Sequence, residues 1–429
     1  MGAKIIEEGS KYLISEMAET LERSEIIKLA SEINEKIKNG ERIYNLTIGD
    51  FDPSLFPIPD ELKKNIAAAY DQGQTNYPPP EGIVDLRRVV SDFLFTRGGL
   101  EYSENEILIS GGGRPLIYAA YQALLDPGDS VIFPVPSWNN NHYSHLARAK
   151  QIPVQTKEEN NFMLSADEIS PYLEEATLIA VCSPLNPTGT AFSKKGLQDI
   201  CELIVKENKK RNGIKKLVYL LYDQIYWTLT YGDTVHYNPV DLVPEVRPFT
   251  ICIDGMSKSF AATGLRIGWG FGPQELINKM RTILSHIGAW APKPEQVGAA
   301  NFLRNDEAVD RYLKHIRSGI SERLEAFYKG FKTLKSLGFN VDAIAPQAAM
   351  YLTVKVDLAG YTAQNGTRLN TTADITKYLL DEAKIALVPF SAFGASKSSR
   401  WYRLSVGMAS ISDIDNFFES FKKALVILV

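Results

Sequence analysis

Residues 250–268, TICIDGMSKSFAATGLRIG, join a short apolar run to a segment of small and polar residues. The run Thr250–Ile253 is typical of a strand that is buried on both faces. Lys258 follows in a largely apolar stretch, and Arg266 comes eight positions later. A lysine held in a pocket can have a lowered pKa and serve as nucleophile and base. We therefore expect a buried strand that ends beside a reactive lysine.

Outward from this stretch, short apolar runs alternate with segments of helical spacing. The strand-length runs are Ile107–Ile109, Val131–Phe133, Leu178–Cys182, Leu217–Tyr222, Thr250–Ile253 and Ile267–Phe271. The segments between and before them that have helical character are Pro59–Gln72, Gly82–Leu94, Leu116–Leu125 and Lys194–Asn208. This alternation predicts an α/β fold with a mostly parallel central sheet that is covered by helices on both faces.

The pattern changes after Pro292. Long, highly charged helices are expected over Glu295–Leu337, followed by strand-like runs around a helix at Thr372–Ala383. We therefore predict a large domain over residues 56–300 and a smaller α+β domain over residues 301–429. Residues 1–55 are expected to complete the smaller domain.

Composition excludes several classes of protein. The 429 residues carry a formal net charge of −4, which argues against broad nucleic-acid binding because such binding needs clustered cations. The three cysteines are too widely spaced for a disulfide framework or a zinc site. His142 and His145 could suggest a metal pair, but no third ligand is in view, so we expect no metal.

The ends of the chain predict neither a leader nor a membrane anchor. Charged residues are spread through the first twenty positions, where a secretory leader would be apolar. The apolar run over residues 424–429 is far shorter than the ~20 residues that a membrane span needs. We expect a cytoplasmic protein with no membrane partner.

Polar groups follow successive predicted strands, in an order that fits one ligand. Three glycines and Arg114 follow the strand at 107–109, and glycines between a strand and a helix can bind a phosphate. Asn186, Asp223 with Tyr226, and Lys258 with Arg266 follow later strands. Pyridoxal phosphate needs such a set: a phosphate cradle, groups for its phenolic oxygen, an acid for its ring nitrogen and an amine for its aldehyde.

At this point the chain resembles the fold-type-I class I and II aminotransferases, the aspartate-aminotransferase-like superfamily, from roughly Leu21 to the C-terminus. The segments that carry the resemblance are residues 45–52 (NLTIGDFD), 76–87 (NYPPPEGIVDLR), 112–114, 126–129 (DPGD), 136–138, 186–189 (NPTG), 223–226, 257–268 (SKSFAATGLRIG) and 403–405 (RLS). Their order and spacing are far more specific than any one of them.

The resemblance implies a role for each matching residue. Lys258 looks like the Schiff-base lysine, Asp223 like the partner of the pyridine nitrogen, and Arg403, helped by Gly49 and Asn186, like the binding site of the substrate α-carboxylate. The remaining cofactor residues would be Asn186 and Tyr226 for the phenolic oxygen, Trp138 stacked on the ring, Gly113, Arg114 and Arg266 for the phosphate, and Tyr77 for the phosphate of a neighbouring subunit. That last role implies a homodimer with shared active sites.

The chain also departs from the family pattern at three single positions and at residues 348–351, where Ala-Ala-Met-Tyr stands in place of the common Gly-Ala-Phe-Tyr. Gly255 stands where many relatives have a phosphate-binding serine, and Phe390 where they often have a glycine. Gln122 matches, in our interpretation, a lysine that binds the distal carboxylate in one bacterial subgroup. These differences leave the amino-acid substrate open, and Phe390 suggests a bulky or aromatic one.

The resemblance predicts an aminotransferase that moves an amino group between an L-amino acid and a 2-oxo acid in a ping-pong cycle. The same residues could serve a carbon–sulfur β-lyase, which would eliminate a β-substituent instead. The sequence leaves this alternative open.

Overall fold

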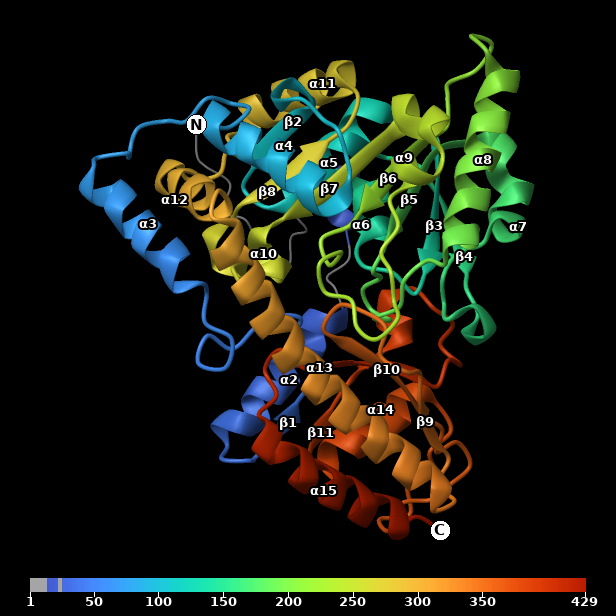
Figure 1. Ribbon diagram of the computed structural model, residues 1–429. Helices are drawn as coiled ribbons and strands as arrows, with labels where there is room; N and C mark the ends of the chain where they lie inside the picture. The colour runs from blue at the N-terminus through green and yellow to red at the C-terminus, as the bar shows by residue number, and fades with distance from the viewer. Residues whose placement is uncertain (1–13, 22–24) are drawn as a thin grey trace, which may run out of the picture.

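The computed structural model describes residues 14–21 and 25–429 and has an α/β architecture around two larger sheets and one two-stranded sheet (Figure 1). Residues 1–13 and 22–24 of the predicted N-terminal segment lie outside the described residues. Most of the first twenty positions, on which the expectation of no secretory leader rests, are among them. The larger sheet has seven strands in the order β2-β8-β7-β6-β5-β3-β4. They are β2 (Ile107–Ser110), β8 (Gly268–Phe271), β7 (Thr250–Gly255), β6 (Tyr219–Asp223), β5 (Ala176–Cys182), β3 (Ser130–Val135) and β4 (Lys150–Gln155).

All neighbouring pairs in this sheet are parallel except the two that involve β8, which is antiparallel to both β2 and β7. The predicted mostly parallel sheet is therefore confirmed. The strand interiors are buried because helices cover both faces. The helices α4 (Val84–Gly98), α8 (Lys194–Arg211) and α12 (Lys293–Leu303) pack on one face, and α5 (Gly113–Leu124) and α11 (Gln274–Ile287) pack on the other.

The smaller sheet has four strands in the order β12-β13-β10-β9, all antiparallel. They are β12 (Val388–Pro389), β13 (Trp401–Ser405), β10 (Tyr351–Val356) and β9 (Val341–Ala343). Its core includes side chains of α14 (Thr372–Asp381) and α15 (Ile414–Val426). The long helix α13 (Asp306–Ser336) runs from the part of the molecule that holds the larger sheet to the part that holds the smaller sheet (Figure 1). Its side chains contribute to the hydrophobic cores of both parts.

The N-terminal segment lies against this second part of the molecule. Its strand β1 (Tyr44–Asn45) pairs in parallel with β11 (Ile385–Ala386), and Ile33 of helix α2 (Glu25–Lys38) packs on Leu380 and Ala386. Both observations support the predicted grouping of the N-terminus with the small domain. The exact boundaries at residues 55 and 300 stay predictions.

One edge of the large sheet collects the polar residues that the sequence singles out. Strands β2, β3, β5, β6 and β7 run in one direction, so their carboxyl ends meet at the same edge. The small domain faces this edge, as its β13 residue Arg403 bonds to Asn186 beyond β5. No helix of the described residues is long and apolar enough to cross a membrane.

Candidate active site

Lys258 lies on the short helix α10 (Met256–Ser259), directly after β7. Its amine donates a hydrogen bond to the Gly49 carbonyl at 2.6 Å. Burial lowers the pKa of Lys258 to about 8, and three arginines, at positions 403, 114 and 266, act in the same direction, whereas Asp50 opposes them. The amine is therefore deprotonated far more readily than an ordinary lysine, as a nucleophile or proton carrier requires.

Asp223 ends strand β6 opposite Cys182 of β5. Its carboxylate accepts a hydrogen bond from the backbone N–H of Ile225 at 3.0 Å, and it has no ion pair with any residue that the structure describes. Burial raises the pKa of Asp223 to about 6. A buried carboxylate with so little compensation is stabilised by a cationic hydrogen-bond donor, such as a protonated ring nitrogen.

Three successive glycines and Arg266 form a cradle at the start of α5. Helix α5 begins at Gly113, so the N–H groups of its first turn have no intrahelical partner. The Arg266 guanidinium donates to the carbonyls of Thr263 and Gly111 at 2.6 and 2.9 Å. Gly112 has φ +96°, and a Cβ there would stand 2.3 Å from an Arg266 nitrogen. Only glycine allows this approach of a cation to a helix N-terminus, an arrangement that suits a phosphate.

Arg403 lies opposite this cradle, buried in β13. Its two Nη atoms donate to Asn186 Oδ1 at 3.0 Å and to the Thr47 carbonyl at 2.6 Å. Its Nε is buried and has no hydrogen-bond partner among the described residues. Burying an unpaired guanidinium N–H is costly, so this donor is well suited to receive a ligand carboxylate.

Two aromatic residues without a predicted role contact the guanidinium of Arg403. Its Cζ lies 4.8 Å from the ring centre of Tyr351 and 4.9 Å from that of Phe393. The Tyr351 hydroxyl is 2.7 Å from that of the predicted Tyr226. The rings of Tyr351 and Phe393 both belong to the small domain. No local sequence pattern indicates which residues of the large domain they would contact.

The predicted ring-stacking residue Trp138 follows β3 at the same edge. Its ring is 6.3 Å from that of Phe393, and the Arg114 guanidinium carbon lies 5.4 Å from its centre. Arg114 is exposed and makes no hydrogen bond or ion pair with another described residue, and its positive charge is among those that lower the pKa of Lys258. The sequence predicted that Arg114 binds the phosphate chiefly through its backbone N–H. The structure adds a side-chain cation that is free to bind a ligand.

The predicted phosphate residue Tyr77 lies at the surface. It is 81% exposed, and its ring packs edge-on against Trp290 at 5.2 Å. The indole N–H of Trp290 is buried with no partner that the structure describes. Trp290 also borders the glycine cradle, because its carbonyl oxygen lies 3.4 Å from the Cβ position of Gly111.

The three single-residue departures from the family pattern receive physical explanations. At Gly255 a Cβ would stand 2.7 Å from the Ile267 carbonyl oxygen and 2.8 Å from the Gly268 Cα, so no serine fits there. Phe390 is completely buried against Phe162, so its predicted effect on substrate choice is not supported. Phe393, three residues later, faces Arg403 instead.

The interpretation of Gln122 is also corrected. Helix α5 points its N-terminus, with Arg114, at the site, and Gln122 comes eight residues later. At 1.5 Å per residue, this places Gln122 roughly 12 Å farther along the helix axis. Arg114, not Gln122, is the α5 side chain that can reach a substrate.

Taken as a set, these residues fit pyridoxal phosphate. The glycine cradle and Arg266 suit its phosphate, the undercompensated Asp223 suits its ring nitrogen, and the Lys258 amine suits its aldehyde. No group of three or more His, Cys, Asp or Glu residues that could hold a metal ion occurs in the described ranges, 14–21 and 25–429.

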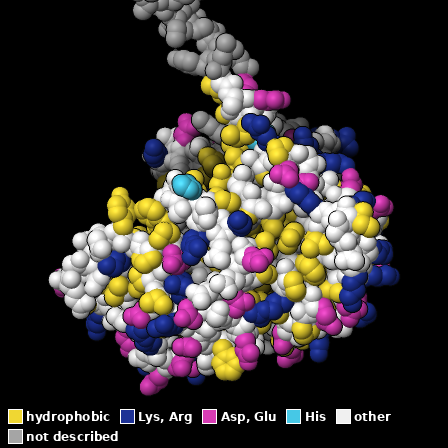
Figure 2. Space-filling model, turned by 90° about the horizontal axis from the view of Figure 1, so that it is seen from above, with side chains coloured by type: hydrophobic (Ala, Val, Ile, Leu, Met, Phe, Trp, Pro, Cys, Tyr) yellow, Lys and Arg dark blue, Asp and Glu magenta, His cyan; other side chains and the backbone are white. Residues whose placement is uncertain are grey.

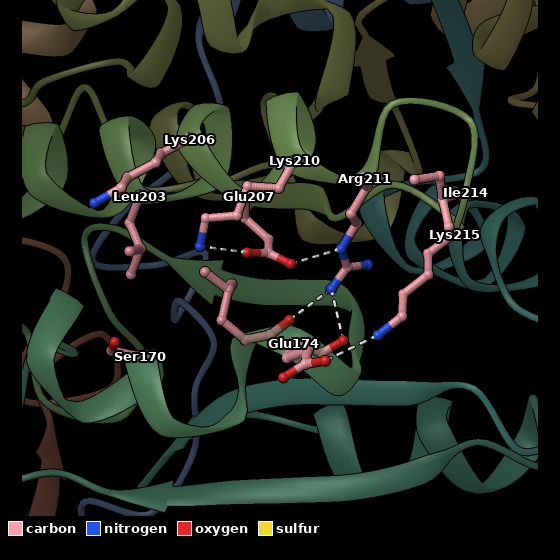
Figure 3. A pocket seen from close by; sticks show the side chains of 10 residues that line it. Ser170, Glu174, Leu203, Lys206, Glu207, Lys210, Arg211, Ile214 and Lys215 are labelled. Atoms are coloured by element: carbon pink, nitrogen blue, oxygen red, sulfur yellow. Dashed lines mark hydrogen bonds and ion pairs between the residues drawn. The ribbon is translucent and has the colours of Figure 1, made fainter.

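A hollow of about 530 Å³ lies elsewhere, between α8 and the 3-10 helix η3 (Ser170–Glu175). Figure 3 shows that its charged side chains already face one another: Arg211 bonds to Glu207 and to main-chain carbonyls, and Lys215 pairs with Glu174. None of the predicted site residues lines this hollow. Of the four cations that line it, Lys210, Arg211 and Lys215 are engaged within the fold, and Lys206 points away from the others, so this hollow is a weaker candidate for chemistry than the sheet edge.

Comparison with known proteins agrees with this site. Residues 41–421 match the family described as aminotransferase class I and II. The aspartate aminotransferase of Bacillus sp. strain YM-2 is 27% identical over 412 residues, which cover 95% of this chain and 99% of the relative. A probable aspartate/prephenate aminotransferase of Rickettsia conorii is 29% identical over 89% of this chain and 92% of its own length.

Solved structures give the same result. The aspartate aminotransferase of Rhizobium meliloti superposes with a TM-score of 0.88 at 25% identity and covers 98% of this chain and 100% of its own. The Thermus thermophilus aspartate aminotransferase with maleate has a TM-score of 0.84 at 26% identity, with 97% and 100% covered. The relatives named here are all described as aminotransferases, and nothing in them favours a lyase.

Proposed function

Because the chain belongs to the class I and II aminotransferases, it is a pyridoxal-phosphate-dependent aminotransferase, and we propose that its preferred amino donor is a dicarboxylic amino acid such as aspartate. The observation that carries this proposal is the second cation. Arg403 presents a buried Nε without a described partner, and Arg114 is an exposed cation without a described partner; the charges of both lower the pKa of Lys258. Two carboxylates of one substrate would be bound by two arginines. The names of the relatives support the same choice.

The residues of this chain divide the work as follows. Bound pyridoxal phosphate supplies an electron sink for the charge that develops at the substrate Cα. Lys258 would attach the cofactor through its amine and, while that amine is free, would carry the proton between the substrate Cα and the cofactor C4′. Its lowered pKa, about 8, keeps an appreciable neutral fraction near neutral pH. Asp223 accepts the hydrogen bond of the protonated ring nitrogen.

The other residues orient the reactants. Gly113, Arg114 through its backbone N–H, and Arg266 bind the phosphate. Tyr226 and Asn186 donate to the phenolic oxygen, and Trp138 covers the ring. Arg403 binds the α-carboxylate, with Gly49 and Asn186 at its side. This assignment is supported by the 3.0 Å bond between Arg403 and Asn186 and by the unpartnered Nε.

We further propose that the enzyme is a homodimer in the cytoplasm. Tyr77 is 81% exposed, so its side chain is accessible to the phosphate bound by a second copy. The three free cysteines agree with a reducing compartment. On the face seen in Figure 2, positive and negative side chains are interspersed among apolar ones, which agrees with partners other than nucleic acid.

The substrate proposal is tested by Arg114→Gln, which removes the charge and keeps the backbone N–H for the phosphate. We expect kcat/KM for aspartate to fall about 30-fold, as loss of a charged hydrogen bond costs, and kcat/KM for phenylalanine to change less than about threefold. Arg42→Gln, in a surface ion pair with Asp413, is the matched control. Equal losses for both substrates, or a wild-type preference for phenylalanine, would contradict the proposal.

A further inference from the structure

Tyr351 is a buried residue between the two halves of the site. It begins strand β10 and is 1% exposed. Its hydroxyl is 2.7 Å from that of Tyr226, and the face of its ring lies against Arg403. One side chain therefore contacts the residue expected at the cofactor oxygen and the residue expected at the substrate carboxylate.

The ring of Tyr351 restricts the guanidinium plane of Arg403. Phe393 is the second ring over this guanidinium, at 4.9 Å, so two aromatic rings contact the group. Its Nη atoms are held by Asn186 and the Thr47 carbonyl, so only rotation out of the plane would misdirect the free Nε. Aromatic faces attract a guanidinium and oppose that rotation.

The hydroxyl of Tyr351 has a separate task. A phenol has one proton to donate, so a Tyr226 that donates to the cofactor oxygen can only accept from Tyr351. Tyr351 is then the donor of the 2.7 Å bond, and a phenol that accepts a hydrogen bond becomes a stronger donor itself. The small Gly49 permits this placement, since a Cβ there would stand 3.0 Å from the Tyr351 hydroxyl.

We propose that Tyr351 is a positioning residue that links the two halves of the site: its ring orients Arg403 toward the substrate carboxylate, and its hydroxyl donates to Tyr226 and so strengthens the hydrogen bond that Tyr226 gives to the cofactor. This inference rests on the roles proposed above for Arg403 and Tyr226. It does not depend on which amino acid is the substrate.

The experiment separates the ring from the hydroxyl with two variants of the holoenzyme, Tyr351→Phe and Tyr351→Leu. The first readout is the pH midpoint of the cofactor absorbance change. The second is the Kd of two carboxylates without an amine, maleate and 3-phenylpropionate, followed by the same absorbance. Both variants should raise the pH midpoint by about 0.5 unit. The reason is that a weaker hydrogen bond from Tyr226 to the phenolic oxygen stabilises the deprotonated form of the bound cofactor less. Only Tyr351→Leu should weaken carboxylate binding, by about tenfold.

Tyr378→Phe is the matched control, because Tyr378 is a buried tyrosine whose hydroxyl bonds to the Ala424 carbonyl in the small domain. It should change neither readout. An unchanged midpoint in Tyr351→Phe would overturn the proposal, and so would equal losses of carboxylate binding in the two variants. Should Tyr351→Leu fail to fold, the midpoint in Tyr351→Phe still decides.

The two carboxylates keep this test distinct from that of the substrate proposal. A wild-type enzyme that binds 3-phenylpropionate better than maleate contradicts the dicarboxylic substrate. The role of Tyr351 is then judged on 3-phenylpropionate alone, because both probes carry a carboxylate for Arg403.

Discussion

The buried position of Lys258 lowers the stability of the folded protein, because burial opposes the protonation of its amine. Burial and the neighbouring arginines lower its pKa from 10.5 to about 8, so the folded protein binds the proton less tightly than the unfolded chain does. The resulting loss of stability is fully present below pH 8 and disappears as the pH rises toward 10.5. A group whose protonation is opposed in this way is kept for its chemistry.

We therefore predict that Lys258→Met stabilises the protein without cofactor by about 2 kcal/mol at pH 7. The gain should shrink steadily between pH 8 and 10, because the wild-type lysine becomes neutral there. Urea unfolding of both proteins at pH 7 and pH 9.5 measures the two values.

Lys314→Met, on an exposed position of α13, serves as the control and should show no such pH-dependent gain. A stability difference between Lys258→Met and wild type that is constant from pH 7 to pH 9.5 would mean that the lysine carries its ordinary proton affinity in the fold.

At the scale of elements, the close pairing of β7 and β8 explains why position 255 cannot carry the serine that many relatives have there. The two strands are antiparallel, and Gly255 pairs with Gly268. The backbone of β8 lies so close that a Cβ on Gly255 would stand 2.7 Å from the Ile267 oxygen. Backbone cannot move aside as a flexible side chain can, so overpacking here is costly.

Gly255→Ser should therefore destabilise the enzyme by about 2–3 kcal/mol and should not improve phosphate binding. Thermal unfolding and the Kd of the cofactor measure the two effects. Gly264→Ser is the matched control, because nothing lies within 4 Å of its Cβ position and its φ is not in the left-handed range. A stable Gly255→Ser variant that binds the cofactor more tightly would show that β8 can move.

The elements that the sequence predicts well are those with a repeating apolar pattern. Six predicted strands appear as β2, β3, β5, β6, β7 and β8, because strands that are covered on both faces, including the edge strand β2, are continuously apolar. The edge strand β4 was not predicted, since its residues Lys150–Gln155 alternate between exposed and buried and contain a proline. The pairing of β1 with β11 involves two residues on each side, too few to give a periodic signal.

For the whole molecule, the site could be predicted only as far as it follows one sheet. Asp223 and Lys258 come after strands of the large sheet, so their meeting at its edge follows from the topology. The contacts of Arg403 with Asn186 and Tyr351 depend on how the small domain lies on that edge. Residues joined across such an interface have no common pattern in the sequence, and only the resemblance to a family indicated Arg403 beforehand.

The role of Tyr77 concerns two molecules rather than one. Its side chain is 81% exposed and so accessible to a second copy of the chain, and in a shared site each subunit would complete the other. We predict that Tyr77→Ala and Lys258→Ala restore activity when the two variants are unfolded and refolded together. Each variant alone should be weakly active or inactive at a cofactor concentration that saturates only the wild type.

In a mixed dimer, the site that keeps Lys258 receives Tyr77 from the other subunit, whereas the second site lacks both. Random association yields mixed dimers for half of the population, each with one complete site of two, so the expected activity is about a quarter of wild type. Sedimentation confirms that the mixture is dimeric, and refolding Lys258→Ala with Asp223→Ala, two residues of the same chain's site, should restore nothing. Activity that stays at the average of the separate variants would place Tyr77 outside the partner's site.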